Sequence, residues 1–265
     1  MAGPLFTLTT DFGAGSGYPA QVKGVLLAAH PDARIVDVTH EVPPYDILAG
    51  ALLLEACLPW FARDAIHLAV VDPGVGTARR ALCVIDAEGR RLLGPDNGLL
   101  TPFLGRGTRV RSLLGGGILP LPRSATFHGR DLFAPAAAYL ARGGTPAALG
   151  PEVTDPVRLD WPEATASEAG DEVGGVTLAA DPYGNLVTSI RGADLEGRPV
   201  REAQVDGAPV PFVRTFGEVE RGALLALVGS GGRVEVSVRE GSAAERLGRR
   251  RGVAVRLLLG PASPA

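Results

Sequence analysis

Residues 67–80 read His-Leu-Ala-Val-Val-Asp-Pro-Gly-Val-Gly-Thr-Ala-Arg-Arg, and this stretch decides how the rest of the chain is interpreted. Apart from His67, its first five residues are apolar and partly β-branched, which is typical of a buried parallel strand. The strand stops at Asp72, because Pro73 lacks an amide donor and disfavours helix at the preceding residue. Asp72 therefore follows the carboxyl end of a strand, where open α/β sheets bind their ligands. Two glycines then allow close backbone approach, and Arg79 can fold back towards the same place.

The composition of the 265 residues is that of an ordinary globular protein, with 46% hydrophobic and 21% charged residues. A formal net charge of −3 gives no reason to expect nucleic acid or an anionic membrane as a partner. The N-terminus lacks the pattern of a signal peptide, and no apolar run is long enough to span a bilayer. Cys57 and Cys83 lie in apolar segments without metal-type spacing, so we expect reduced thiols and a cytoplasmic location.

Strands and helices alternate through the first 150 residues or so, which predicts an α/β domain with a mostly parallel sheet and flanking helices. Asp46 is the expected N-cap of an apolar helix that Pro59 stops. Residues 104–125 are expected to be irregular, with a strand near Ile118. The other expected strands are residues 5–10, 34–38, 67–71, 80–86 and 91–94, and the expected helices are 19–30, 46–58 and 131–142.

A linker-like stretch rich in Ala, Glu, Thr, Ser and Gly follows at residues 161–171. Beyond it the pattern changes to short strands bounded by glycine turns, and Pro211 limits one of them to an edge position. This pattern predicts a smaller all-β domain, barrel or sandwich, so that residues 1–165 form the α/β domain and residues 166–265 the β-rich domain. The expected strands are residues 173–179, 186–190, 210–214, 224–228, 234–239 and 253–259.

Three side chains are candidates for activating a water molecule: Asp72, Arg79 and His128. The glycine after His128 leaves open space at the imidazole. Ordinary structural explanations also exist, because Asp-Pro-Gly is a common turn sequence and paired arginines are often solvated. The glycines at 74 and 76 lack the third glycine of a nucleotide-binding fingerprint. No two histidines have helical ligand spacing, so a metal site is not expected.

The motifs are more specific together than any of them is alone. In order, they are TTDFG (9–13), KG (23–24), DVTHE (37–41), VDPGVGT (71–77), GPDNGL (94–99), FHGRD (127–131) and YGN (183–185). Over essentially its whole length the chain resembles the S-adenosylmethionine (SAM) hydroxide adenosyltransferases, also called SAM hydrolases, which are related to fluorinase and chlorinase.

The resemblance assigns the family's catalytic Asp-Arg-His set to Asp72, Arg79 and His128. It implies an α/β catalytic domain, a β-rich C-terminal domain that binds adenosine, and a homotrimer with active sites between neighbouring subunits. In the halide-using relatives a tyrosine matches Asp72, and a serine that helps hold fluoride matches Gly129. A carboxylate there repels an anionic halide but accepts a hydrogen bond from water, which favours hydroxide as the nucleophile.

The resemblance also implies the substrate-binding residues. Asp11 is expected to accept hydrogen bonds from both ribose hydroxyls, and Asn185 to read the adenine edge. Two positions depart from the family pattern: Ser16 replaces a carboxylate near the methionine ammonium, and Glu240 replaces an asparagine. The other expected contacts are Tyr45 as an aromatic wall, Asp181 at the amino-acid end, and Ser230, Glu235 and Val238 in the late part of the adenosine site.

The predicted reaction is substitution at the 5′ carbon of SAM by activated water, which gives adenosine and methionine without a cofactor. His128 is the first choice for the proton acceptor, and the resemblance points to the R-sulfonium epimer. Two alternatives stay open at this point. One is a halide-dependent synthase of the same fold, which would yield a 5′-halo-adenosine. The other is a SAM or adenosine sensor, which would bind without releasing methionine.

Overall fold

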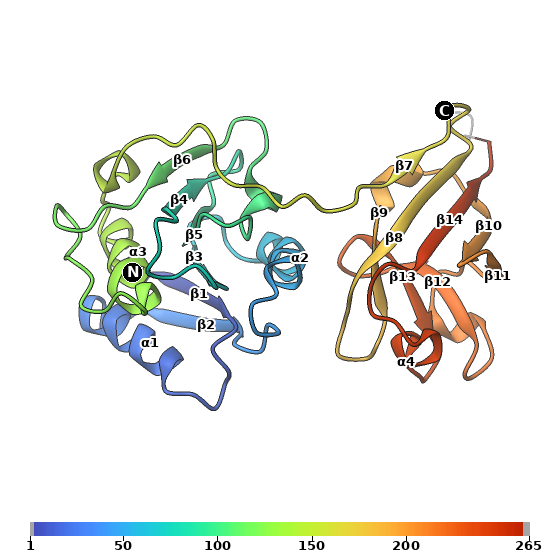
Figure 1. Ribbon diagram of the computed structural model, residues 1–265, viewed down its shortest axis with the longest axis horizontal. Coiled ribbons are helices and arrows are strands. Elements are labelled where there is room, and N and C mark those ends of the chain that lie inside the picture. Colours follow the sequence, from blue (N-terminus) through green and yellow to red (C-terminus); the bar gives the residue numbers. More distant parts are fainter. Residues whose placement is uncertain (1–2, 262–265) are drawn as a thin grey trace. The chain divides into compact units, whose positions relative to one another are not determined.

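One six-stranded sheet, with strand order β2-β1-β3-β5-β4-β6, forms the centre of the N-terminal unit, Met1–Leu159 (Figure 1). The computed structural model describes residues 3–261. The strands are β1 (Leu5–Thr10), β2 (Arg34–Thr39), β3 (Ile66–Val70), β4 (Ala81–Ile85), β5 (Arg91–Pro95) and β6 (Arg109–Ser112), and the helices are α1 (Tyr18–Ala29), α2 (Ile47–Cys57) and α3 (Ala134–Ala141).

This sheet is mixed, so the expectation of a mostly parallel sheet needs correction. Strand β1 is parallel to β2 and β3, and β3 is parallel to β5. Strand β4, however, is antiparallel to both β5 and β6. The reason is the short turn around Glu88, in which Asp86 Oδ1 accepts the amides of Glu88 and Arg90 at 2.9 Å each. A turn of this length makes a hairpin, whereas a parallel pair needs a crossover of about a dozen residues or more.

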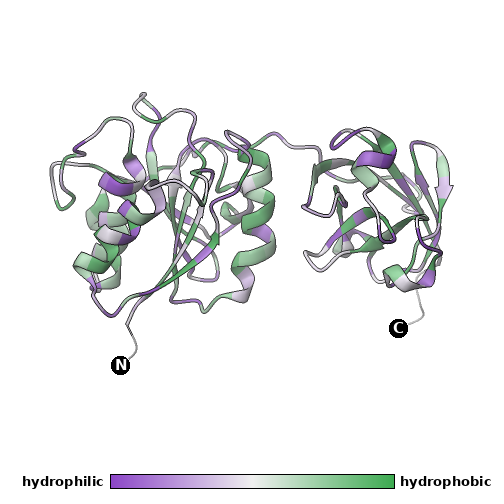
Figure 2. Ribbon diagram, turned by 90° about the horizontal axis from the view of Figure 1, so that it is seen from below, coloured by the Kyte–Doolittle hydropathy of each residue, from purple (hydrophilic) through white to green (hydrophobic). Residues whose placement is uncertain are grey.

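Helices pack on both faces of the sheet and bury its central strands, whereas edge strand β2 has no buried residue. Phe6, Leu8 and Leu68 pack with α1 and α3, while Val71 and Leu92 pack with α2 on the other side. Strand β3 is buried at all five positions, including His67, as its largely apolar sequence predicts. Figure 2 shows α2 coloured as hydrophobic along most of its length. Helix α2 begins at the predicted cap, where Asp46 Oδ1 accepts the Ala49 amide at 3.0 Å.

The C-terminal unit, Asp160–Ala265, is an antiparallel, nearly closed barrel with strand order β11-β10-β14-β8-β9-β13-β12, and β7 pairs with β8. The two ends of this order approach each other through a bridge between Phe212 and Ala226. Its elements are β7 (Thr165–Ala166), β8 (Glu172–Ala180), β9 (Leu186–Arg191), β10 (Val200–Val205), β11 (Ala208–Val210), β12 (Leu224–Val228), β13 (Arg233–Val238), α4 (Ala243–Leu247) and β14 (Ala254–Leu259).

Several local expectations were wrong. The strand expected at 210–214 is β11, which ends at Val210, and β10 was missed because polar residues occupy its exposed positions. Ile118 lies in a turn, whereas β6 forms within the stretch expected to be irregular. Helix α4 was also missed, although Ser242 Oγ caps it by accepting the Glu245 amide at 3.1 Å. Within residues 3–261, no helix has the length and apolar character needed to cross a membrane.

Candidate active site

The carboxyl ends of β1 and β3 lie side by side, because these strands pair in parallel up to Thr10 and Val70. The chain leaves β1 for β2 on one side of this pair, and it leaves β3 for β5 and β4 on the other. Such a switch point is where open α/β sheets bind ligands. The two predicted carboxylates, Asp11 and Asp72, follow these two strand ends. The sheet therefore places both at the same edge.

The loop after β3 folds back on itself, which returns Arg79 to Asp72. Thr77 Oγ1 donates to the Gly74 carbonyl at 2.7 Å and accepts the Arg79 amide at 3.3 Å. Gly76 has φ +78°, and a β carbon there would lie 2.7 Å from the Ala125 carbonyl oxygen. Only glycine fits a position with that backbone conformation and that neighbour.

Arg79 joins Asp72 to His128. Its Nε donates to Asp72 Oδ1 at 2.9 Å, and its Nη2 donates both to Asp72 Oδ2 and, at 2.9 Å, to His128 Nδ1. The Asp72 and Arg79 side chains are only 5% and 9% exposed. Hydrogen bonds offset the cost of burying an ion pair, and the bidentate contact supplies one to each Asp72 oxygen. Three residues from separate parts of the sequence thus form one hydrogen-bonded set.

The contact with Arg79 fixes the protonation of His128. A guanidinium can only donate, so Nδ1 must carry the lone pair, and the ring proton of the neutral imidazole is on Nε2. Burial and the Arg79 charge lower the pKa of His128, while Asp72 and Asp131 oppose that shift. His128 is therefore a neutral ring near pH 7, with Nε2–H as its free donor.

A π turn at Gly129–Phe133 follows His128 directly and holds it in place. Asp131 stabilises this turn, because its carboxylate accepts the Ser124 amide at 2.8 Å and forms an ion pair with Arg130. The Arg79 guanidinium also lies 5.7 Å from the centre of the Phe133 ring. Single π turns are rare and are found frequently at functional sites.

Asp11 and Tyr45 are brought together, because the Tyr45 amide donates to Asp11 Oδ2 at 3.0 Å. Tyr45 has φ +67°, an unusual conformation for an aromatic residue, and its side chain is exposed. Strained backbone of this kind gathers at functional sites. Ser16 lies in the loop between β1 and α1. Its amide donates to the Gly13 carbonyl, and its Oγ accepts the Tyr18 amide.

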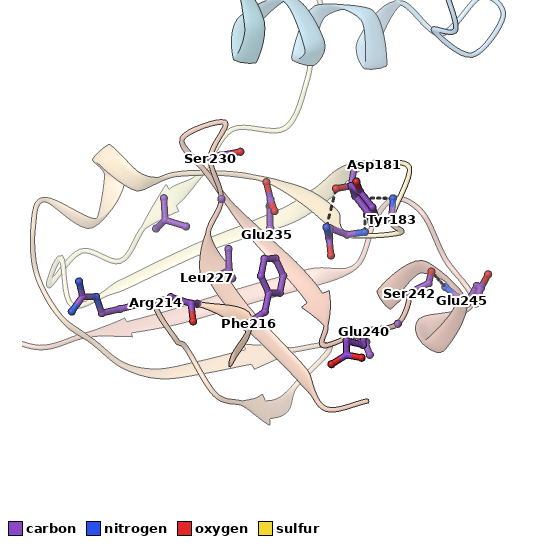
Figure 3. Close-up of a pocket in the computed structure, with 16 residues that line it drawn as sticks. Asp181, Tyr183, Arg214, Phe216, Leu227, Ser230, Glu235, Glu240, Ser242 and Glu245 are labelled. Atoms are coloured by element: carbon purple, nitrogen blue, oxygen red, sulfur yellow. Dashed lines mark hydrogen bonds between the residues drawn. The ribbon is translucent and has the colours of Figure 1, made fainter. Parts of the chain in front are cut away.

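A hollow of about 880 Å³ opens on the barrel of the C-terminal unit (Figure 3). All five C-terminal residues that the resemblance assigned to the substrate line it: Asp181, Asn185, Ser230, Glu235 and Val238. They come from the turn between β8 and β9 and from the segment containing β13.

Asp181 positions Asn185 within this hollow. Its Oδ1 accepts the Asn185 amide, and its Oδ2 accepts Asn185 Nδ2, both at 2.8 Å. Asn185 Oδ1 and the second Nδ2 proton remain for a ligand with both an acceptor and a donor. Burial, and then the charge of Asp181, raise the pKa of Glu235, which faces the same space.

The hollow also contains residues that the sequence did not single out, above all Phe216 and Arg214. Phe216 is 43% exposed on a short turn, in which Glu218 Oε1 accepts the amides of Arg214 and Thr215. The Thr-Phe-Gly-Glu sequence at 215–218 matches a capping box, and this signal could have located the turn. Across the described residues 3–261, no group of three or more His, Cys, Asp or Glu side chains is arranged to hold a metal ion.

Comparison with known proteins gives a consistent result along the chain. Residues 6–150 match the SAM hydroxide adenosyltransferase N-terminal domain, and residues 175–256 match the C-terminal domain. The (R)-S-adenosyl-L-methionine hydrolase of Thermus thermophilus is 44% identical over 268 residues, which cover 96% of this chain and 99% of that protein. The fluorinase of Actinopolyspora mzabensis is more distant, with 28% identity over 74% of this chain and 75% of its own.

The fold shows the same relationship. An uncharacterized conserved protein from Thermotoga maritima, solved by crystallography, superposes with a TM-score of 0.85 at 29% identity and covers 96% of this chain and 99% of its own. Both domain matches lie in the order that the sequence motifs predicted, which confirms the resemblance. The chain belongs to the SAM hydroxide adenosyltransferase family.

Proposed function

We propose that this protein hydrolyses the R-sulfonium epimer of SAM to adenosine and L-methionine. The observation that carries the proposal is the Asp72–Arg79–His128 set at the switch point of a chain from this family. A relative at 44% identity over nearly the whole chain is named as an (R)-SAM hydrolase.

The chemistry is a substitution at the 5′ carbon. A water oxygen forms a bond to C5′, the bond between C5′ and sulfur breaks, and its electron pair stays on the sulfur of methionine. The water loses one proton to a base. Because the positively charged sulfonium leaves as a neutral thioether, no acid has to protonate it. The work of the protein is to align one water opposite the leaving sulfur and to exclude others.

The geometry supports Asp72, rather than His128, as the proton acceptor. Nδ1 of His128 already accepts from Arg79, so the neutral ring offers only a donor, Nε2–H, to a water. The Asp72 oxygens bind Arg79 but keep further lone pairs. In this arrangement Asp72 takes the proton, His128 orients the water, and Arg79 fixes both and balances the charge of the carboxylate. We therefore propose Asp72 as the proton acceptor in place of His128, the first choice from the sequence.

The same carboxylate also favours water over a halide as the nucleophile. A halide at the position of the water would lie beside the negative charge of Asp72, in a site with little solvent to screen it. Water instead gains an acceptor for its proton. Hydrolysis is therefore preferred over the halide-dependent reaction.

Substrate recognition is proposed to use both units. Asp11 would accept the ribose hydroxyls through the oxygen that Tyr45 leaves free. The hollow on the barrel would hold adenine, with Asn185 at its edge and Phe216 as an apolar wall. We further propose a homotrimer, in which the Asp72 set of one subunit acts on adenosine held by a neighbour's barrel. Ser16 in place of a carboxylate would weaken the contact with the methionine ammonium.

The decisive experiment incubates the purified protein with each SAM epimer and follows adenosine and methionine by chromatography. We expect adenosine from the R epimer, with no dependence on chloride or fluoride. A 5′-halo-adenosine product would instead identify a halide-dependent synthase.

Asp72→Asn and His128→Gln should each lower kcat by about 10² or more while adenosine binding, measured by calorimetry, is retained. Wild-type protein that binds adenosine but releases no methionine over hours would identify a sensor. Full activity in Asp72→Asn would overturn the assignment of this residue.

A further inference from the structure

We propose that Asn97 is a positioning residue that holds the loop carrying Asp72 and Arg79, an inference that rests on the proposed function. Its side chain contacts the residue directly before Asp72. Asn97 lies directly after Asp96, beyond the end of β5.

The strand order makes this position a natural support. Strand β5 lies between β3 and β4, so the loop that leaves β3 and enters β4 must cross over the end of β5. Leu68 pairs with Leu93 on one side of β5, and Ala81 pairs with Pro95 on the other. The two residues that follow Pro95 therefore reach both ends of the loop.

Hydrogen bonds fix each end. At the entry, Asn97 Nδ2 donates to the carbonyl of Val71, the residue before Asp72, at 2.9 Å. At the exit, the Asp96 amide donates to the Arg80 carbonyl at 2.9 Å, and Arg79 Nη1 donates to the same oxygen at 3.2 Å. The segment therefore sets the direction from which Asp72 leaves the strand, and it also supports the guanidinium that binds Asp72 and His128.

The support is itself rigid. Asn97 Oδ1 accepts the Leu99 amide at 3.1 Å, and Leu99 is fully buried. The side chain of Asp96 is buried too, and it accepts Arg80 Nε at 2.6 Å and the Val157 amide at 2.7 Å. The Asn97 side chain thus accepts a hydrogen bond within its own turn through Oδ1 and donates one to the loop that carries Asp72 through Nδ2. Aspartate can do the first but not the second.

This difference gives a sharp test on the full-length protein. Asn97→Asp keeps the acceptor for the Leu99 amide and loses the donor to Val71, while Asn97→Ala loses both. We expect Asn97→Asp to lower kcat for adenosine release by about 10², with KM changed less than about threefold, because misplaced reacting groups cost rate more than binding.

Thr101→Val is the matched control. The Thr101 hydroxyl belongs to the same turn, donates to the Gly98 carbonyl at 2.6 Å and accepts the Leu159 amide at 2.8 Å, but none of its bonds touches the loop. This variant should lose stability and keep kcat. If Thr101→Val and Asn97→Asp lower kcat equally, or if Asn97→Asp keeps wild-type kcat, the proposal is wrong.

A second measurement does not depend on turnover. The chain has only four histidines, so the ¹⁵N signals of the His128 ring can be assigned by comparison with His128→Gln. In the wild type we expect an acceptor Nδ1, a protonated Nε2 and a pKa below the ordinary value. In Asn97→Asp, the ¹⁵N signals of the His128 ring should shift towards those of the tautomer mixture of a free histidine, and its pKa should shift towards the ordinary value. Unchanged His128 signals would overturn the proposal even if the enzyme acted on another substrate.

Discussion

At the scale of single residues, Arg79 is the centre of the site. Its Nε and Nη2 hold Asp72, Nη2 also reaches His128, and Nη1 binds the Arg80 carbonyl. This uses the planar fork of a guanidinium, which presents several donors in fixed directions. A lysine carries the same charge but has one nitrogen, so it cannot hold both partners in the same geometry.

Arg79→Lys should therefore lower kcat by about 10² or more, even though the charge is kept. The measurement is steady-state adenosine release, with folding checked by circular dichroism. Arg63→Lys is a suitable control, because Arg63 is exposed and its Glu88 partner is 4.0 Å away. Arg79→Lys with wild-type turnover would show that charge alone is sufficient.

His67 shows how one buried side chain sets a pH limit on stability. Burial, followed by the charge of Arg90, lowers the pKa of His67 to about 4, while Asp86 opposes the shift. The unfolded chain binds a proton near pH 6.5 and the native chain does not, so the native state is penalised as the pH falls from 6.5 towards 4. The full effect is about 3 kcal/mol in the free energy of unfolding.

We expect urea unfolding of the wild type to show this loss between pH 7 and pH 4.5, and His67→Gln to remove part of the slope. Both proteins share all carboxylates, so the difference between their slopes isolates His67. If the free energy of unfolding depends on pH with the same slope in both proteins, the pH dependence does not come from His67.

At the scale of elements, the site depends on how strands end. Strand β3 delivers Asp72, the folded-back loop returns Arg79, and the π turn at Gly129–Phe133 holds His128. Asp72 and Arg79 lie outside regular helices and strands, and His128 lies where the π turn begins. Each is nevertheless fixed by contacts to neighbouring elements, which is what pre-organises the reacting groups.

Gly76 is where the loop tolerates least change. Gly76→Ala would combine φ +78° with a clash against the Ala125 carbonyl, and should cost about 2 kcal/mol or more in unfolding free energy together with most of kcat. Gly74→Ala is the matched control in the same loop, because its β carbon would meet Arg79 Cγ at an ordinary 3.4 Å. Equal effects of the two substitutions would show that the backbone conformation at Gly76 is not the cause.

At the scale of the whole molecule, the two units carry different parts of the proposed chemistry. The N-terminal unit holds the Asp72 set, and the C-terminal unit holds the hollow lined by Asn185 and Phe216. If the active site forms between subunits of a trimer, a chain altered only in its C-terminal unit can still supply an intact Asp72 set. A neighbouring chain altered only in its N-terminal unit can supply an intact hollow.

Co-expressed Asp72→Asn and Asn185→Ala chains should therefore recover roughly a quarter of wild-type activity, the statistical share of sites with both halves intact. Each variant alone should be nearly inactive, and light scattering should give three times the mass of one chain. No recovery in mixed trimers would place the whole site within one chain.

Much of the candidate site could be located from sequence, because its residues lie at recognisable strand ends and in motifs of specific composition. The buried run before Asp72, the Asp46 cap and the change to short strands after residue 171 were all visible in local patterns. Local patterns suffice there because hydrophobic periodicity and capping depend on neighbours in the sequence.

Other features required the tertiary structure. The tautomer of His128 depends on a guanidinium 49 positions away in the chain. The grip of Asn97 on Val71 likewise depends on which strand lies between which others. The sequence alone determined which side chains are available for the chemistry. The fold decided which atoms of those side chains are free to act, because hydrogen-bond partners distant along the chain are set by strand order and packing.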